Sequence, residues 1–557
     1  MLESMRFLPF ALLASTVLQP AIAQDKPQPR SQPRPSAATV KQWQDQKFGM
    51  FIHFGLYSQL GGMWQGKRID NGYSEQIMAN APIPLDEYAA TAKTFNPTKW
   101  DPDAIVKLAK DAGMKYIILT SKHHDGFNMF ATKQTNYNVV DATPYHRDIV
   151  KELADACHRG GIGFGVYYSS IDWHQPGMDH YIEGNSNPIN EAHAQFNAAQ
   201  LRELMTNYGP IREIWFDMGK PTPEQSNLFA TTVHKLQPQT MVSGRVWNYQ
   251  GDFTVMGDNE VPKYGLDEPW QTPASIFGAT WGYRSWQQRD DLQAKINENI
   301  LKLVQVVSRG GNYILNIGPE GDGSVVPYEA SVLSGVGSWL KPVSEAIYGT
   351  TASPFGDLDF GYATAKPGRI YLFVKAAPNN ELRLPMAAGT HFLAAESLQT
   401  HQKLKITTDG KDVVIHTQPG APSTYLPTIE LRYTGPLRIE KTLVAKGDVP
   451  YTLNEANAEK FWNYNGMGYE APKTLYKLRW LVPQGCSTMS FHTSGTVKVA
   501  LTSNGETKEV ALNDGSSQTI TVGSDQSFEI TPPQPFTKGT ALPLTIGAID
   551  VMPKSCP

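Results

Sequence analysis

Short apolar runs alternate with longer amphipathic segments over residues 40–345. The apolar runs have the length of buried strands, and the segments between them repeat their apolar positions with a helical period. Strands are predicted at 48–55, 116–120, 164–169, 214–216, 241–243 and 312–318, and helices at 101–112, 147–159, 193–207, 223–236, 290–308 and 327–342. This alternation is typical of α/β proteins and predicts a (β/α)8-like barrel over residues 39–345, a fold that takes ~250 residues or more. Residues 248–285 are expected to form a long irregular stretch within it.

The pattern changes near residue 350, where helical periods end and short alternating runs begin. Residues 369–374 and 428–433 are such runs, and they predict a β-sandwich over 350–437. Residues 438–557 are also β-like, with turn signals at Asn504-Gly505 and Asn513-Asp514-Gly515. This second β-rich domain is a candidate for carbohydrate binding because it holds the aromatic residues Trp462, Tyr464 and Trp480, although a packed core accounts for them equally well.

Polar side chains follow several of the predicted barrel strands. Asp217 comes directly after the apolar run 214–216, His53 closes the first apolar run, and His123 and His124 follow the strand at 116–120. Residues in such positions point into the mouth of a barrel, where active sites lie. A carboxylate buried without a partner loses several kcal/mol of hydration, so Asp217 calls for a functional role, a helix N-cap or a structural ion pair.

Arg245 and three tryptophans, Trp64, Trp215 and Trp281, complete the candidate site. Imidazole and guanidinium groups hydrogen-bond ring hydroxyls, and aromatic rings cover apolar faces, so the set suits a neutral polyhydroxylated substrate. A structural hydrogen bond is the alternative role for any single histidine. No His pair at i, i+4 and no carboxylate partner spacing supports a metal site, so no metal is expected.

Length and charge narrow the function classes. A chain of 557 residues is expected to form two or three domains of ~100–200 residues each. The net charge of -4 and the lack of a basic stripe argue against nucleic acid as a partner. Aromatic residues make up 10% of the chain and include 12 Trp. This number allows some rings to stack on sugars while most pack in the core.

The first 23 residues have the features of a secretory signal peptide. Arg6 precedes an apolar run at 7–18, and Ala21-Ile22-Ala23 forms a small-residue cleavage pattern. Residues 24–38 are rich in Pro, Gln and Ser and are predicted to be a disordered linker. No other apolar run approaches the length of a membrane span, so the mature protein is expected to be soluble, and periplasmic or secreted.

Three cysteines are present. Cys157 lies on a predicted helix and is expected to be a small buried hydrophobe. Cys486 and Cys556 both lie in the last domain, and export permits a disulfide between them. Sequence alone does not give their Cα separation, so free thiols remain the alternative.

Five segments together resemble the α-L-fucosidases of glycoside hydrolase family 29. They are FGMFIHFG at 48–55, SKHHDGF at 121–127, IWFD at 214–217, WGY at 281–283 and GNYILNIGP at 311–319. The resemblance covers about 40–345. It implies an exo-acting enzyme that removes terminal α-L-fucose from a glycan or oligosaccharide with retention, through a covalent fucosyl-enzyme and without a cofactor. Retention needs two carboxyl groups ~5–5.5 Å apart.

The resemblance also implies roles for individual residues. Asp217 matches the family nucleophile, and the residues around the fucose would be His53, His123, His124, Trp215 and Arg245. Further substrate contacts are expected from Trp64, Glu75, Tyr168 and Trp281. The family commonly has Glu-Trp at the position of Glu75, where this chain has Gln76 instead, so that aromatic contact is in doubt.

The acid/base residue is expected in the stretch 251–262. Glu260 is the first choice, Asp258 the first alternative and Glu268 the second. Other members often have a Glu after the Trp of the stretch Pro-Trp-Gln-Thr-Pro, but this chain has Gln271 there, and an amide cannot transfer the proton. A solvated loop carboxylate is the alternative role for Glu260.

Two rival functions stay open at this point. One is a carbohydrate-binding protein on a barrel that has lost catalysis, which the departures at Gln76 and Gln271 motivate. The other is a glycosidase with a different sugar preference. The sequence indicates neither the linkage that is cleaved nor an oligomeric state.

Overall fold

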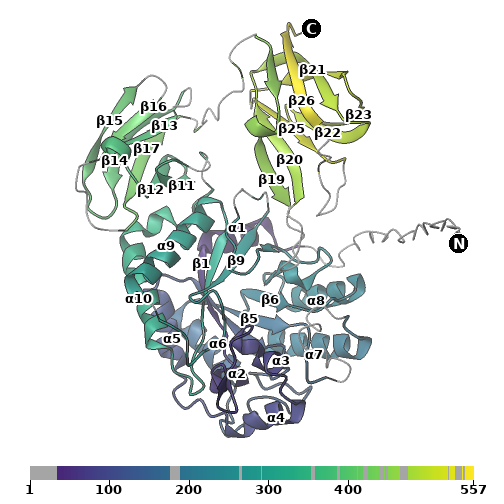
Figure 1. Ribbon diagram of the computed structural model, residues 1–557, viewed down its shortest axis with the longest axis vertical. Coiled ribbons are helices and arrows are strands. Elements are labelled where there is room, and N and C mark those ends of the chain that lie inside the picture. The colour runs from purple at the N-terminus through teal and green to yellow at the C-terminus, as the bar shows by residue number, and fades with distance from the viewer. Residues whose placement is uncertain are drawn as a thin grey trace, which may run out of the picture.

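A computed structural model gives the fold of the chain (Figure 1). It describes residues 34–175, 188–262, 266, 268–289, 291–352, 355, 358–385, 389–409, 412–417, 425–435, 437, 445, 449–463, 474–524, 526–533, 542 and 546–556. The predicted signal peptide at 1–23 and most of the predicted linker at 24–38 lie outside these residues. The first helix, α1, spans Ala37–Gln46 and therefore begins inside the last two residues of that linker.

Eight parallel strands form a closed ring in the first domain. Their order is β7-β6-β5-β4-β1-β10-β9-β8, and a bridge between Ser243 and Phe253 joins β7 back to β8. The strands are β1 (Phe48–Ile52), β4 (Tyr116–Lys122), β5 (Gly163–Ser169), β6 (Glu213–Asp217), β7 (Met241–Val242), β8 (Thr254–Val255), β9 (Trp270–Ser275) and β10 (Asn312–Ile317). The predicted barrel is confirmed.

Six long helices cover the outside of this ring (Figure 1). They are α5 (Pro102–Asp111), α6 (Ile149–Gly160), α7 (Glu191–Asn207), α8 (Pro223–Leu236), α9 (Leu292–Ser308) and α10 (Pro327–Val343). Side chains of Asp101, Asp148, Asn190, Thr222 and Asp291 cap the first five by accepting a backbone N–H of the first turn. The predicted helices agree with these within about three residues.

Two strands of the ring lie where an irregular stretch was predicted. Strand β8 has only two residues, and β9 has the sequence WQTPAS, with a proline and three polar side chains. No apolar run marks it, because β9 is buried among groups that hydrogen-bond inside the barrel. Pro273 is tolerated because its neighbour β8 pairs only with Trp270 and Gln271 and has ended before the proline is reached.

The barrel is closed at one end and open at the other. Trp43 of α1 is fully buried and packs in one cluster with residues that point into the barrel, among them Phe51, Tyr116 and Trp215. The short helices α2 (Leu56–Leu60), α3 (Ile77–Asn80) and α4 (Leu85–Ala90) follow β1 and lie at the opposite end (Figure 1). The carboxyl ends of the strands therefore meet at the end away from α1.

Seven antiparallel strands form the second domain, as predicted for 350–437. They are β11 (Gly361–Lys366), β12 (Arg369–Val374), β13 (Glu381–Pro385), β14 (His391–Ser397), β15 (Lys403–Asp409), β16 (Asp412–His416) and β17 (Thr428–Thr434). Trp339 of α10 fixes the domain to the barrel, because its ring packs near Phe373 and its indole N–H donates to the Tyr425 carbonyl at 2.8 Å.

Two antiparallel sheets form the third domain. The first contains β18 (Tyr451–Leu453), β26 (Ile546–Lys554), β21 (Gly485–Thr493) and β24 (Ser516–Val522). The second contains β19 (Glu459–Asn463), β20 (Thr474–Leu481), β25 (Ser527–Thr531), β22 (Val497–Ser503) and β23 (Glu506–Leu512). Trp480 is buried in the core between them. The side chain of Trp462 and all of Tyr464 lie outside the described residues.

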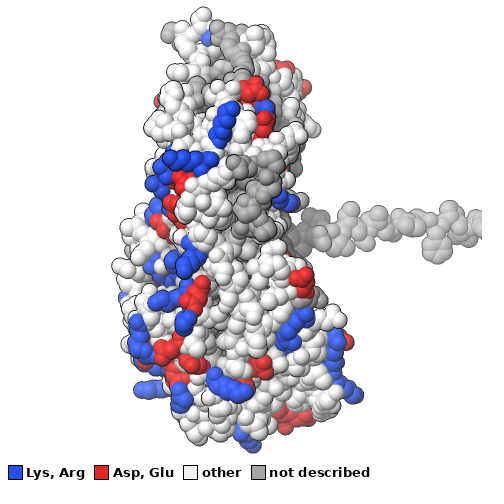
Figure 2. Space-filling model, turned by 90° about the vertical axis from the view of Figure 1, so that its left-hand side faces the viewer, with Lys and Arg blue, Asp and Glu red and all other residues white. Residues whose placement is uncertain are grey.

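Both β domains lie at the end of the barrel where α1 is found, away from α2, α3 and α4 (Figure 1). On the face seen in Figure 2, basic and acidic side chains are interspersed and no patch of one sign forms. Helices long and apolar enough to cross a membrane are not found among the described residues.

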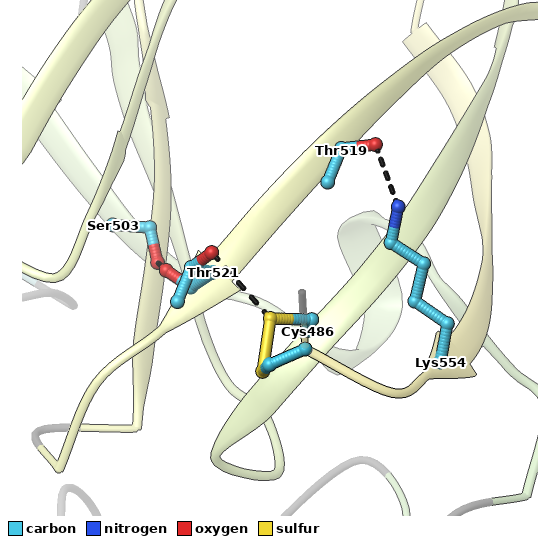
Figure 3. Close-up of a disulfide and its surroundings, with 6 residues drawn as sticks. Cys486, Ser503, Thr519, Thr521 and Lys554 are labelled. Atoms are coloured by element: carbon cyan, nitrogen blue, oxygen red, sulfur yellow. Dashed lines mark hydrogen bonds between the residues drawn. A yellow bond between two sulfur atoms is a disulfide. The ribbon is translucent and has the colours of Figure 1, made fainter.

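A disulfide joins Cys486 in β21 to Cys556, which follows β26, so the bond left open by the sequence is present (Figure 3). It connects residues 70 apart in the sequence, and Lys554 beside it donates to the Thr519 hydroxyl at 3.0 Å. Cys157 is buried and free, as expected. The bond ties the segment after β26 to the start of β21, the strand that pairs with β26.

Removal of this disulfide should destabilise the third domain alone. Closure of a loop of this length contributes about 4 kcal/mol through the unfolded chain, so the double variant Cys486→Ser, Cys556→Ser should unfold its third domain at lower temperature. Calorimetry of the variant measures this, and thiol treatment of the unmodified protein is the matched control. An unchanged transition in both would contradict the prediction.

Candidate active site

One cavity of about 290 Å³ lies at the open end of the barrel, where the carboxyl ends of β1, β4, β5 and β6 meet the loops that follow. Polar and aromatic side chains alternate around it: Phe51, His53, Tyr73, Glu75, Gln76, His123, His124, Tyr167, Trp215, Asp217, Met218, Arg245, Asp258 and Trp281. Hydrogen-bonding groups beside aromatic rings suit a small polar ligand that also has an apolar face.

Asp217 at the end of β6 is held from two sides. Arg245 Nη1 donates to Oδ1 at 2.9 Å, and the Tyr167 hydroxyl donates to Oδ2 at 2.7 Å. Burial would raise the pKa of Asp217, but the charge of Arg245, the neighbouring His124 ring and these hydrogen bonds outweigh it, so the pKa lies below its usual value. The carboxylate is therefore ionised and close to the cavity, with 7% of the residue exposed.

Arg245 connects this carboxylate to a second one. It lies in the short 3₁₀ helix Gly244–Val246 directly after β7, and its Nη2 donates to Asp258 Oδ1 at 2.8 Å. The guanidinium carbon lies 4.7 Å from the centre of the Trp215 ring, in cation–π contact. Asp217 and Asp258 thus bind adjacent nitrogens of one guanidinium, which brings the two carboxyl groups close together at the cavity wall.

Three histidine rings form one side of the cavity. The centre of His123 is 4.1 Å from that of His124 and 5.6 Å from that of His53. Burial lowers the pKa of His53 to about 3 and that of His124 to about 4, and burial together with the other two rings lowers the pKa of His123. All three are neutral at ordinary pH, so they offer hydrogen bonds to a ligand without a charge.

Glu75 supports the aromatic wall of the cavity. Its Oε2 accepts the backbone N–H of Trp281 at 3.1 Å and that of Gly282 at 2.8 Å, which fixes the loop that carries the Trp281 ring. Burial raises the pKa of Glu75 to about 7. Added bulk at Gly282 would press on Tyr57, because a Cβ there would lie 3.0 Å from its ring.

Most of the predicted site residues meet in this cavity. His53, Glu75, His123, His124, Trp215, Asp217, Arg245, Asp258 and Trp281 all line it. Tyr167 lines the cavity and touches Asp217 but was not predicted, because it lies inside a strand and not at the change from apolar to polar residues at a strand end. The period of a strand could have found it: Tyr167 lies two residues before Ser169, the partner of Asp217 in the sheet register, on the same face.

Tyr168, predicted to contact substrate, does not face the cavity. Neighbouring residues of a strand point to opposite sides, so Tyr168 points outward, and its hydroxyl lies 2.7 Å from both Asn197 Oδ1 and Gln200 Oε1 of α7. Trp64 lies in the short strand β2 (Met63–Trp64), outside the cavity lining.

Glu260 and Glu268, two of the three acid/base candidates, lie outside the cavity lining. Glu260 Oε2 turns back and accepts the Gly257 N–H at 3.1 Å, and Glu268 accepts a hydrogen bond from the Thr254 hydroxyl. Of the candidates, the structure places only Asp258 beside Asp217. Gln271 lies beneath the cavity, where its Oε1 accepts the indole N–H of Trp215 at 2.9 Å.

The described residues were also compared with the ligand sets that hold metal ions. Among the parts of the chain that the structure describes, no group of three or more His, Cys, Asp or Glu side chains has the geometry to hold a metal ion.

Comparisons with known proteins agree on one family. The family model described as Alpha-L-fucosidase matches residues 15–345. The tissue alpha-L-fucosidase of Mus musculus is 31% identical over 430 residues, which are 72% of this chain and 92% of the relative. The plasma alpha-L-fucosidase of Homo sapiens is 34% identical over 340 residues, 56% of this chain and 70% of the relative.

Solved structures show the same likeness. The GH29 alpha-L-fucosidase of Bacteroides thetaiotaomicron has a TM-score of 0.65 at 26% identity and covers 74% of this chain and 98% of its own. The alpha-L-fucosidase of Vibrio sp. strain EJY3 has a TM-score of 0.67 at 26% identity and covers 94% of this chain and 99% of its own. The second likeness extends over the β domains as well.

Replacement of Glu75 by Gln should change how stability depends on pH. Between about 4.5 and about 7 the folded protein keeps the Glu75 proton while the unfolded chain has lost it, so this group makes the protein less stable as pH rises. The effect amounts to about 3 kcal/mol across that range. The free energy of unfolding of Glu75→Gln should therefore fall less over this pH range than that of the unmodified protein.

Calorimetric unfolding of the barrel at several pH values measures this difference. The matched control is Glu224→Gln, which makes the same change at an exposed residue in the first turn of α8. Equal slopes for Glu75→Gln and the control would contradict the raised pKa of Glu75.

Proposed function

The chain belongs to the α-L-fucosidase family, glycoside hydrolase family 29, and from this membership we propose that it is an exo-acting, retaining enzyme that hydrolyses terminal α-L-fucose from glycans. The observation that carries the proposal is Asp217, an ionised carboxylate at the cavity, fixed between Arg245 and Tyr167. Such a group is oriented and charged for nucleophilic attack before any substrate arrives.

The reaction begins with attack of Asp217 on the anomeric carbon. A bond forms between a carboxylate oxygen and that carbon while the bond to the leaving oxygen breaks, and the result is a fucosyl ester. In support, a GH29 alpha-L-fucosidase of Bacteroides thetaiotaomicron has been solved as a trapped covalent intermediate with 2-fluoro-fucosyl fluoride. Water then hydrolyses the ester and restores the carboxylate, with net retention.

Asp258 is proposed as the acid/base residue, in place of Glu260. The leaving oxygen needs a proton in the first step, and the attacking water must lose one in the second. Asp258 and Asp217 share one guanidinium, so two negative charges there would face a single positive one. Since Asp217 is the ionised nucleophile, Asp258 is the carboxyl group proposed to supply and later recover the proton.

The other side chains that line the cavity are suited to the hydroxyl groups and the methyl group of a deoxy sugar. The neutral rings of His53, His123 and His124 can hydrogen-bond hydroxyl groups, whereas Phe51, Trp215 and Trp281 offer aromatic faces for the ring and methyl group. Trp43 and Trp215 close the barrel below, so a chain cannot pass through. A cavity with a closed floor accepts the end of a glycan and not a chain that runs through it, which supports exo action.

Export from the cytoplasm is also proposed, to the periplasm or the outside. The leader-like composition of residues 1–23 supports it, as does the disulfide Cys486–Cys556, since such bonds persist in oxidising compartments.

Labelling should identify Asp217 directly. The enzyme treated with 2-fluoro-fucosyl fluoride should carry the sugar on the peptide that contains Asp217, as read by mass spectrometry after digestion. Asp217→Ala should take up no label and should lose at least ~10³-fold in kcat on an aryl α-L-fucoside. A label on another carboxylate, or full activity of this variant, would refute the assignment, whereas fucose binding without turnover in the unmodified protein would favour the binding-protein alternative.

Paired variants should distinguish the two acid/base candidates. Asp258→Ala should lose ~10²–10⁴-fold in kcat/KM on a natural fucoside, and much less on a dinitrophenyl fucoside, whose leaving group needs no proton. Glu260→Ala is the matched control, two residues away and outside the cavity lining, and should lose little on either substrate. A large loss for Glu260→Ala and a small loss for Asp258→Ala would instead assign the acid/base role to Glu260.

A further inference from the structure

Two buried residues behind the histidines are not explained by the proposed reaction. Asn316 of β10 and Ser169 of β5 are 1% and 0% exposed and lie outside the cavity lining. Each contacts one imidazole Nδ1 at 2.7 Å: Asn316 Oδ1 that of His53, and Ser169 Oγ that of His124. The bond made by one ring nitrogen decides whether the other nitrogen carries a proton.

The orientation of Asn316 is fixed by a carbonyl. Its Nδ2 donates to the Trp281 carbonyl at 2.7 Å, and a carbonyl can only accept. Asn316 Oδ1 must therefore be the atom that faces His53, and Oδ1 can only accept as well. The His53 proton is then on Nδ1, and Nε2 carries a lone pair.

Ser169 likewise fixes the Nδ1–H form of His124, because its hydroxyl has a single hydrogen. Its hydroxyl donates to the Ile171 carbonyl at 3.0 Å, which uses the only hydrogen that the hydroxyl has. The oxygen must then accept from His124 Nδ1–H. His124 Nε2, which lies 3.8 Å from Asp217 Oδ2, is left without a proton, and this distance is too long for a hydrogen bond.

We propose that Asn316 and Ser169 are positioning residues that lock His53 and His124 in the Nδ1–H form, so that both rings present hydrogen-bond acceptors to the substrate. Two ligand hydroxyl groups must then donate to these rings. Unprotonated Nε2 of His124 also adds no second donor to Asp217 Oδ2, which already accepts from the Tyr167 hydroxyl. The inference extends the proposed fucosidase function by assigning the direction of these hydrogen bonds.

His123 provides the contrast within the same cluster. Its Nδ1 is buried and has no hydrogen-bond partner among the described residues. Buried N–H groups without an acceptor are rare, so the proton belongs on Nε2 and His123 acts as a donor. The three rings therefore form an acceptor, a donor and an acceptor, a pattern that a sugar must match with its own hydroxyl directions.

The test is the tautomer of each ring in the ligand-free protein. Full-length protein labelled with 15N-histidine gives two-bond 15N–1H correlations that separate Nδ1–H from Nε2–H rings, and single His→Gln variants assign them. His53 and His124 should show the Nδ1–H pattern and His123 the Nε2–H pattern. An Nε2–H pattern for His53 or His124 would overturn the proposal, and the spectrum needs no enzymatic activity, so it remains valid if the proposed function fails.

Variants add a kinetic test. Ser169→Ala removes the acceptor, so His124 should switch to Nε2–H and present an N–H beside Asp217 and the substrate in place of an acceptor. This change should lower kcat about tenfold or more, with a smaller change in KM. Asn316→Leu should switch His53 in the same way and weaken fucose binding by about tenfold. Ser169→Thr keeps the hydroxyl and should restore the tautomer and most of kcat.

The matched control is Thr407→Ala in the second domain. The Thr407 hydroxyl contacts His416 Nε2 at 2.7 Å, a bond of the same kind and length far from the cavity, and its loss should leave kcat unchanged. If Ser169→Ala keeps the Nδ1–H signal of His124 or the full kcat, then Ser169 is only a structural residue and the proposal is wrong.

Discussion

The pairing of Asp217 with Arg245 is the interaction on which the rest of the site depends. Both side chains are almost fully buried, and each would be very costly alone, because a buried charge without a partner loses its hydration. The bond at 2.9 Å compensates this cost for both. It also fixes where the negative charge lies, at the end of β6, and through the second nitrogen of Arg245 it determines the position of Asp258.

Contact with a cation distinguishes Asp217 from three other buried acids of the barrel. Burial raises the pKa of Glu75, Asp125 and Glu213 to about 7. Each of these carboxyl groups is bound mainly by neutral donors, such as the Tyr88 hydroxyl at Asp125 and the Trp43 indole at Glu213. Of these four acids, Asp217 alone has a guanidinium in direct contact, and its pKa moves in the opposite direction. One fold thus holds an ionised carboxylate among acids that tend to keep their protons.

Much of this could be read from the sequence, because strand ends are marked by a change from apolar to polar residues. That change located Asp217, His53, His123 and His124 and gave six of the eight strands. It failed where a buried strand is itself polar, as in β9, and where function comes from the middle of a strand, as with Tyr167. The sequence pattern also could not predict loop geometry. Asp258 and Glu260 are two residues apart, and only the backbone turn decides which one faces the cavity.

The amide at Gln271 is explained by its surroundings and not by loss of function. Its side chain accepts the Trp215 indole proton and donates to the Tyr116 hydroxyl at 3.1 Å and to Glu213 Oε2 at 3.2 Å. A carboxylate at this position would lie beside Glu213 in the closed floor and would lose both donated bonds, whereas the amide satisfies all three partners. The floor that supports Trp215, and through it Arg245, therefore requires the residue that the sequence has. One of the two departures that motivated a barrel without catalysis is thus a structural adaptation, and the carboxyl groups that the chemistry needs lie one layer above it.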